Sequence, residues 1–213
     1  LDSIGQSFWK IPSGEITNLP YLMKIGSIKR EGKKIILSSG MATIDEIKVC
    51  IKILVDAGTN EKDIILLHCN TEYPTPDCDV NILAINDLKK NFPNVKIGFS
   101  DHSVGYIAAV GATVLGIELI EKHFTLDKNF DGPDHKASAN PEELKALVEN
   151  VRRIEEMMGN GTKIVTESER KNKIVARKSI VALTKISAGE VFTENNITCK
   201  RPGNGISPLY WFD

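Results

Sequence analysis

The chain lacks an excess of charge of either sign and lacks any long hydrophobic run. Its 213 residues carry 27 basic and 28 acidic side chains, for a formal net charge of −1. Such a balance gives no electrostatic reason to expect binding to nucleic acid or to an anionic membrane surface. The longest apolar stretches are too short to span a bilayer, and no stretch has the form of a secretory signal. We therefore expect a cytoplasmic protein that binds neither nucleic acid nor membrane.

The chain also lacks the cysteine spacing of a disulfide framework and the glycine motifs of nucleotide-binding proteins. The four cysteines have no C-x-x-C spacing and are too sparse for a disulfide framework, so reduced thiols are expected. Cys69 follows an apolar run and could act as a nucleophile, although filling the core is the commoner role for such a residue. The P-loop and Rossmann glycine motifs are absent, which argues against a nucleotide ligand.

Five compact apolar runs are typical of buried parallel strands. They cover residues 8–12, 34–38, 63–68, 95–100 and 118–123. Helical patterns lie between them, and the alternation predicts an α/β fold with one parallel sheet joined by right-handed crossovers. The spacing leaves two architectures open. One is a small doubly wound sheet, and the other is the C-terminal five-eighths of a (β/α)8 barrel, which usually takes about 250 residues.

Capping signals mark several of the helices between these runs. Thr43 and Glu46 form a capping box, and Asn140 precedes a proline at a first helical position. The predicted helices are a short one near Pro20, one over 43–58, one over 80–90, one over 103–115 and one that starts after Asn140.

The pattern changes after Met158, where Gly159 and Gly161 end the last helix. Residues 167–173 form a charged, mostly polar connector, and residues 176–182 have β character. We expect a first domain over 1–160, a linker over 161–175 and an incomplete small domain over 176–213. The last segment is too short to bury a core of its own.

His102 and His123 each stand where an apolar run stops, and each lies beside an acid, at Asp101 and Glu121. The carboxyl ends of parallel strands meet at one edge of a sheet, where α/β proteins place their active sites. Two imidazoles there can converge on one divalent cation. A single histidine would more often be a packing residue, but two in matched positions favour a metal site. Further carboxylates follow at residues 127, 131 and 134.

The other strand ends carry a lysine, hydroxyls and amides. Hydroxyl donors and one cationic point charge on neighbouring loops suit a phosphate or a phosphorylated enol. Each serine alone could be a helix cap or turn former, but serines at three strand ends weaken that explanation. The residues are Lys10, Ser13, Ser38, Asn70, Thr71 and Ser100.

Two residues near these strand ends are candidates for acid–base chemistry and for orienting a substrate. Glu15 follows the first run directly and could handle a hydroxyl, or it could compensate the dipole of the next helix. Tyr73 follows the third run. Asp134 lies in a Gly- and Pro-rich loop of the kind that covers substrates on βα scaffolds.

Taken together, these motifs resemble the sialic acid synthase family. The matching segments are KIPSGEITN (10–18), LSSGMAT (37–43), HCNTEYPTP (68–76), GFSDHS (98–103), IEKHFTL (120–126) and GPDHKAS (132–138). The tail through KRPGNG (200–205) is similar to the start of the antifreeze-like (SAF) domain of that family, a β-clip fold. The order of the motifs makes the resemblance specific.

The resemblance implies strands four to eight of a TIM barrel, followed by an incomplete SAF domain. It implies an N-acetylneuraminate (sialic acid) synthase, which condenses phosphoenolpyruvate with N-acetylmannosamine and releases phosphate by C–O cleavage. It also implies a domain-swapped homodimer with active sites completed in trans. The cofactor it implies is a divalent metal, Mn²⁺ or else Mg²⁺, on His102 and His123.

Residue roles follow from the same resemblance. Phosphoenolpyruvate would lie on Lys10, Ser13, Ser38, Asn70 or Thr71, and Ser100. The sugar would meet Glu15, Tyr73, Asp134 and, from the partner subunit's tail, Arg201. A legionaminate or pseudaminate synthase, which uses a 2,4-diacetamido-6-deoxy hexose, stays open as the alternative. A metal-dependent hydrolase and a non-catalytic carbohydrate- or ice-binding module are weaker alternatives.

Overall fold

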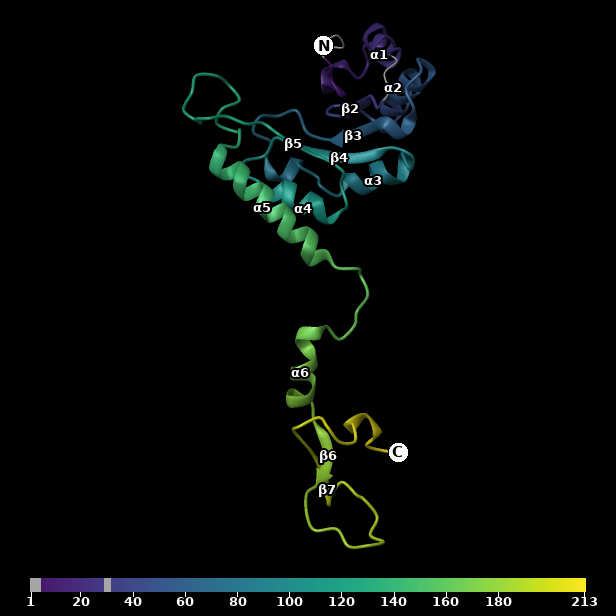
Figure 1. Ribbon diagram of the computed structural model, residues 1–213, viewed down its shortest axis with the longest axis vertical. Helices are drawn as coiled ribbons and strands as arrows, with labels where there is room; N and C mark the ends of the chain where they lie inside the picture. Colours follow the sequence, from purple (N-terminus) through teal and green to yellow (C-terminus); the bar gives the residue numbers. More distant parts are fainter. Residues whose placement is uncertain (1–4, 29–31) are drawn as a thin grey trace. The chain divides into compact units, whose positions relative to one another are not determined.

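The five apolar runs form one parallel sheet in the part of the chain that the computed structural model describes, residues 5–28 and 32–213. The strands are β1 (Phe8–Ile11), β2 (Lys34–Ser38), β3 (Ile64–His68), β4 (Lys96–Asp101) and β5 (Ile120–Lys122) (Figure 1). They lie side by side in chain order. A doubly wound sheet would reverse its strand order at a switch point, whereas a barrel wall keeps chain order. The α/β prediction is confirmed, and the strand order favours the partial barrel.

The two faces of the sheet carry different side chains, because successive residues of a strand point to opposite faces. One face packs against the helices and is apolar, with Ile11, Leu37 and Leu66 fully buried. The other face has a smaller apolar cluster around Leu67. Toward the strand ends this second face turns polar, and the candidate site lies there.

Helices connect the strands and cover the apolar face. They are α1 (Leu19–Gly26), α2 (Ile44–Asp56), α3 (Ala84–Asn91), α4 (Ile107–Val114) and α5 (Pro141–Met158). The predicted capping box at Thr43 is present, and the predicted cap at Asn140 forms a capping box as well. Among the described residues, no helix is both long enough and apolar enough to cross a membrane.

Two helices begin later than the sequence predicted. α3 starts at Ala84 rather than at residue 80, because Asn81 has a positive φ of 45°, which a helix does not allow. α4 starts at Ile107 rather than at residue 103. Gly105 has a φ of 74°, and the Ser103 amide donates to Asp101 Oδ1 at 2.9 Å instead of joining a helix.

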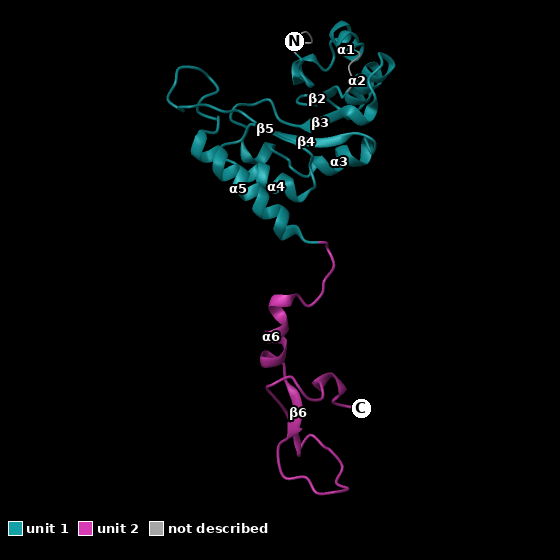
Figure 2. Ribbon diagram, in the orientation of Figure 1, with its two compact units in different colours: residues 1–159 teal, residues 160–213 magenta. Residues whose placement is uncertain are grey.

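The chain divides into two units, Leu1–Gly159 and Asn160–Asp213 (Figure 2). The second unit contains α6 (Glu167–Ala176) and an antiparallel pair, β6 (Ser179–Ala182) and β7 (Ile197–Lys200). The charged connector over 167–173 therefore lies entirely within a helix. Its signal is a capping box, in which the Glu169 carboxylate accepts from the Thr166 amide and hydroxyl, both at 2.9 Å.

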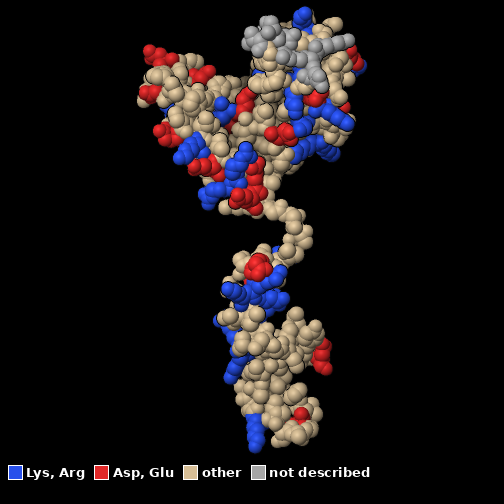
Figure 3. Space-filling view, in the orientation of Figure 1, with Lys and Arg blue, Asp and Glu red and all other residues tan. Residues whose placement is uncertain are grey.

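Surface chemistry in the second unit is uneven. Basic side chains gather over α6, at Arg170, Lys171 and Lys173 (Figure 3). Large apolar side chains are exposed, with Leu209 at 91% and Phe212 at 89%. The described part of this unit therefore buries little of its own apolar surface.

Candidate active site at the strand ends

A cavity of about 310 Å³ opens at the carboxyl ends of the strands in the first unit. Its lining comes from four of the five strand ends and from the loop after β3. The lining residues are Lys10, Pro12, Ser13, Gly14, Ser38, Met41, Thr71, Tyr73, His102, Glu121 and His123. The structure thus brings together residues that the sequence analysis selected separately.

Lys10 forms the cationic side of the cavity. It alternates with buried Trp9 and Ile11 on β1 and so points to the polar face. Its Nζ donates to Ser38 Oγ at 2.7 Å and lies 3.7 Å from Glu121 Oε2. An ammonium group next to a hydroxyl can hold one phosphate or carboxylate group.

The loops after β1, β2 and β3 meet at Gly40. The Gly40 amide donates to Ser13 Oγ at 3.0 Å, and Ser13 Oγ lies 3.4 Å from Cys69 Sγ. A Cβ at Gly40 would stand 2.5 Å from Thr71 Cγ2 and 2.8 Å from Ser13 Oγ. Only a glycine permits this approach, so the three loops are fixed against one another.

Glu121 connects the cationic side of the cavity to the histidines. Ser100 and Glu121 face each other across β4 and β5, and the Ser100 hydroxyl donates to Glu121 Oε1 at 2.7 Å. From the sequence, Glu121 was expected only as an acid close to His123. The signal that could have found it is strand alternation, which places residue 121 on the same face as His123.

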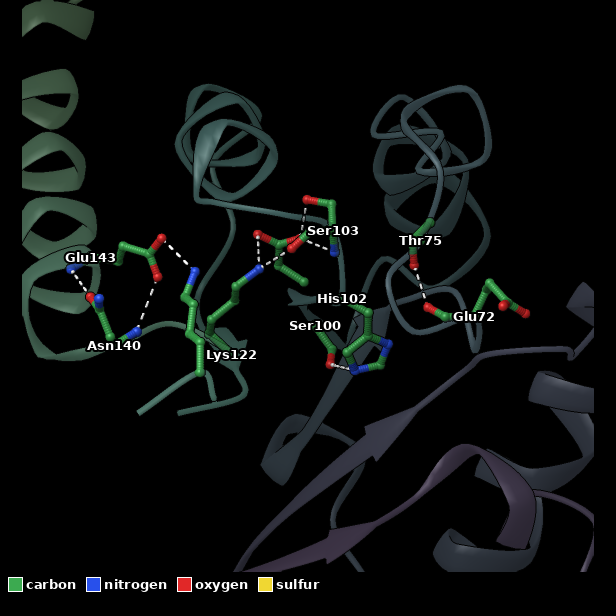
Figure 4. Close-up of polar contacts among 10 residues, drawn as sticks. Glu72, Thr75, Ser100, His102, Ser103, Lys122, Asn140 and Glu143 are labelled. Atoms are coloured by element: carbon green, nitrogen blue, oxygen red, sulfur yellow. Dashed lines mark hydrogen bonds and ion pairs between the residues drawn. The ribbon is translucent and has the colours of Figure 1, made fainter. Parts of the chain in front are cut away.

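His102 is buried and has a polar atom beside each ring nitrogen, of which Figure 4 shows the Ser100 hydroxyl. Its Nδ1 lies 2.5 Å from the Asn70 carbonyl oxygen, which can only accept, so Nδ1 carries a proton. Its Nε2 lies 3.2 Å from Ser100 Oγ. Burial lowers the pKa of His102 below its ordinary value and favours the neutral ring. Since Ser100 gives its single proton to Glu121, the lone pair of Nε2 can accept a cation.

His123 lies beside His102 under the ring of Tyr73. The two imidazole centroids are 5.3 Å apart, and the Tyr73 ring is 4.2 Å from His102 and 5.1 Å from His123. Asp134 Oδ2 lies 3.8 Å from His123 Nδ1. Burial raises the pKa of the Tyr73 phenol, and nearby Cys69, Asp134 and Glu121 add to the shift.

These imidazoles suit a divalent cation that also takes oxygen ligands. A ring nitrogen kept unprotonated by the hydrogen bonds of its neighbours is the form of histidine that ligates metals. Within residues 5–28 and 32–213, no group of three or more His, Cys, Asp or Glu side chains is arranged to hold an ion. Water or substrate would have to complete the coordination, which suits a site with open positions.

Other selected residues have different surroundings. The Glu15 carboxylate accepts from Asn18 Nδ2 at 2.5 Å and is outside the cavity lining. The Asn70 side chain bonds within its own loop, accepting from the Glu72 amide at 2.7 Å, whereas Thr71 lines the cavity. Arg201 belongs to the second unit, where its Nε donates to the Ala176 carbonyl at 3.0 Å. Their substrate roles stay predictions.

Comparison with known proteins decides the family. The NeuB family matches residues 1–163, and the SAF domain matches residues 177–212. The chain belongs to the NeuB family. The resemblance read from the motifs is therefore confirmed, as is the expectation of a SAF region after the barrel segment.

Relatives of this NeuB-family chain include enzymes named for three related sugar acids. The N,N'-diacetyllegionaminic acid synthase of Campylobacter jejuni is 50% identical over 209 residues, covering 98% of this chain and 61% of the relative. The human N-acetylneuraminate-9-phosphate synthase is 36% identical, covering 94% of this chain and 54% of the relative. A pseudaminic acid synthase of Campylobacter jejuni is 41% identical over 187 residues, covering 86% of this chain and 52% of the relative.

Solved structures agree on the fold. The N-acetylneuraminic acid synthetase of Leptospira borgpetersenii, in complex with citrate, matches with a TM-score of 0.71 and 36% identity, over 81% of this chain and 58% of that one. The spore coat polysaccharide biosynthesis protein SpsE of Bacillus subtilis matches with a TM-score of 0.68 and 35% identity, over 99% of this chain and 62% of that one. This NeuB-family chain spans about three-fifths of the curated relatives it matches.

Proposed function

We propose that the protein is a synthase of nine-carbon 2-keto sugar acids that condenses phosphoenolpyruvate with an N-acetylated amino sugar and releases phosphate. The observation that carries the proposal is the single cavity in which His102 and His123 meet the Lys10–Ser38 pair. A cation site and an anion site side by side are what this condensation requires. One polarises an aldehyde, and the other holds a phosphorylated enol.

The sugar that we propose is a 2,4-diacetamido-6-deoxy hexose, which gives a legionaminate. The support is the relative at 50% identity, whose name is that of a diacetyllegionaminic acid synthase, against 36% for the human sialic acid enzyme. This preference replaces N-acetylmannosamine, the first choice of the sequence analysis, with its alternative.

Each side of the cavity has a role in the reaction. Lys10 and Ser38 bind the anionic groups of phosphoenolpyruvate, with Ser13 and Thr71 at the rim. The enol carbon forms a bond to the aldehyde carbon of the sugar, whose oxygen takes up a proton. Water then adds to the carbon that carries the phosphate oxygen, and phosphate leaves as its C–O bond breaks and the ketone forms.

The chain's own residues position the cation and manage the protons. His102 and His123 would hold Mn²⁺ or Mg²⁺, which when bound polarises the sugar carbonyl as a Lewis acid. Glu121, between Lys10 and Ser100, is placed to accept the proton of the adding water. Tyr73 contacts both imidazoles and Asp134 lies beside His123, and these two residues would orient the sugar.

Phosphate release by the whole protein tests the proposal. With phosphoenolpyruvate and Mn²⁺, the diacetamido-6-deoxy sugar should give a kcat/KM at least about tenfold above that of N-acetylmannosamine, because a buried acetamide contact is worth about 1–2 kcal/mol. The reverse ratio would assign the protein to sialic acid. No release with either sugar would contradict the synthase proposal.

We also propose a homodimer in which Arg201 contributes to the sugar site of the partner subunit. A guanidinium can bond sugar oxygens with its rigid fork, which lysine cannot copy. Mixing Arg201→Ala subunits with His123→Ala subunits should restore about a quarter of the wild-type activity, since half of the dimers are mixed and each has one intact site. If the mixture stays inactive after verified subunit exchange, Arg201 does not act in trans.

A further inference from the structure

A buried ion pair lies directly behind the two histidines. Asp101 and Lys122 face each other in register at the ends of β4 and β5. Their charged groups are 3.1 Å apart, and the side chains are 0% and 3% exposed. Strand alternation points them away from the cavity, on the helix-covered face, while Ser100 and Glu121 lie on the opposite face, where Glu121 lines the cavity.

Ser103 closes the network around this pair (Figure 4). Asp101 Oδ1 accepts from the Ser103 amide at 2.9 Å and from its hydroxyl at 2.7 Å. Lys122 Nζ donates to the Ser103 carbonyl at 2.5 Å. The loop from Asp101 to Ser103 is therefore closed on itself, with the backbone of His102 inside it.

Packing alone does not explain two charges at this place. On the same face, the positions just before the strand ends carry buried apolar side chains, with Leu66 at 0% and Phe99 at 2% exposure. Apolar residues of similar volume usually join two strands as well as a buried ion pair does, because burying the charges costs solvation. An ionic network with defined geometry instead fixes positions, and here the fixed positions adjoin His102 and His123.

We propose that Asp101 and Lys122 are a positioning pair that holds the two imidazoles at the spacing needed to share one divalent cation. The pair ties the end of β4 to the end of β5, and each partner immediately precedes one histidine in the chain. Neither side chain touches the cavity, so neither is catalytic. The inference rests on the proposed function, because it assumes that the histidines bind a metal.

The test compares single and paired substitutions in the whole protein. Lys122→Met leaves a buried carboxylate without its partner and should lower Tm by roughly 10 °C. The double variant Asp101→Leu/Lys122→Met removes both charges and should recover most of that loss. Its dissociation constant for Mn²⁺, measured by calorimetry without substrates, should nevertheless rise about 10- to 100-fold, as for other residues that orient metal ligands.

The matched control is the ion pair between Lys96, at the start of β4, and Glu118, just before the start of β5. It lies at the end of these strands that is remote from the histidines. Lys96→Met/Glu118→Gln should leave Mn²⁺ affinity unchanged. If Asp101→Leu/Lys122→Met does not fold, Asp101→Asn/Lys122→Met serves instead, because the amide oxygen still accepts from Ser103. A folded double variant with wild-type Mn²⁺ affinity would overturn the positioning role.

The His102→Ala variant distinguishes a failure of the metal site from a failure of the positioning role. If it abolishes Mn²⁺ binding while the charge-free pair binds normally, the metal site stands and only the positioning role falls. If the wild-type protein and His102→Ala bind Mn²⁺ equally, the metal site itself is wrong, and the positioning role falls with it.

Discussion

The ends of β4 and β5 each deliver an imidazole to the same cavity, but they hold it in different ways. His102 is 8% exposed. Its ring bonds the Asn70 carbonyl, and its own carbonyl accepts from the Thr75 amide at 2.9 Å. The His123 side chain is 35% exposed and has Asp134 at 3.8 Å. The His123 carbonyl is also held, accepting from the Ala139 amide at 2.8 Å, so the difference lies in the rings. The His102 ring is bonded into the β3–β4 framework, while the His123 ring can turn.

One site thus combines a fixed ligand with an adjustable one. A metal ligand that is oriented by a second hydrogen bond keeps its tautomer and direction before the ion arrives. A less constrained ligand can move toward the ion or the substrate at little cost. We expect the fixed side to determine metal affinity and the adjustable side to respond to the sugar.

Removing either histidine should have the largest effect. His102→Ala and His123→Ala should each lower kcat/KM for phosphate release at least about 100-fold, because several kcal/mol of charge stabilisation are lost. The variants should differ in stability, which urea unfolding measures. His102→Ala should cost about 1–3 kcal/mol by leaving a buried carbonyl unpaired, and His123→Ala about 0.5 kcal/mol or less. Equal losses of stability would show that the two rings are held equally firmly.

A substitution at Lys10 tests whether the fixed part of the site extends to β1. Lys10→Ala removes a charge-assisted hydrogen bond donor and should raise the KM for phosphoenolpyruvate about 10- to 100-fold. The KM for the sugar should change less than about threefold, as steady-state kinetics would show. Lys34→Ala, at the exposed start of β2, is the control and should change neither constant. An equal effect of Lys10→Ala on both substrates would remove Lys10 from the anion site.

Tyr73 contacts both imidazoles. A substitution there can separate the contribution of the ring from that of the hydroxyl group. Tyr73→Phe keeps the ring over His102 and His123 but loses the hydroxyl. The KM for the sugar should rise about 2- to 10-fold, the value of one hydrogen bond, and Mn²⁺ affinity should stay constant. A change in Mn²⁺ affinity without a change in the KM for the sugar would place the hydroxyl on the metal side.

The smallest effect concerns acid stability without metal. The folded state lowers the pKa of His102 from 6.5, so the unfolded chain takes up a proton first as the pH falls. The free energy of unfolding should therefore decrease from about pH 6.5 down to the lowered pKa and level off below it. His102→Gln should reduce this slope in urea unfolding at a series of pH values. Identical slopes in both proteins would show that His102 does not titrate in this way.

Much of the fold could be predicted because its signals are local. Apolar runs of strand length mark β1 to β4 closely, and side-chain oxygens at Thr43 and Asn140 mark the helix starts. The late starts of α3 and α4 were not predictable, because they depend on a positive φ at Asn81 and on a bond from Ser103 to Asp101. Both are conformational choices that tertiary contacts make.

The candidate site likewise has a part that the sequence predicted and a part that it did not. The convergence of His102 and His123 followed from their strand-end positions, since parallel strands bring such ends together. The bridge from Lys10 through Glu121 to Ser100 was missed, because it requires the register between β4 and β5. The pairing of Asp101 with Lys122 depends on the same register.

The contact at Gly40 has a consequence for how such a chain can be re-engineered. The loops after β1, β2 and β3 touch one another through Ser13, Gly40 and Thr71. Replacing any one of these loops with a loop from another protein would disturb the other two, so they can be exchanged only as a set. The segment after β5 instead closes on itself, since the Ala139 amide donates to the His123 carbonyl at 2.8 Å and the Thr125 amide to the Ala139 carbonyl at 2.9 Å. Libraries that seek a new sugar preference should therefore diversify that segment and leave the first three loops intact.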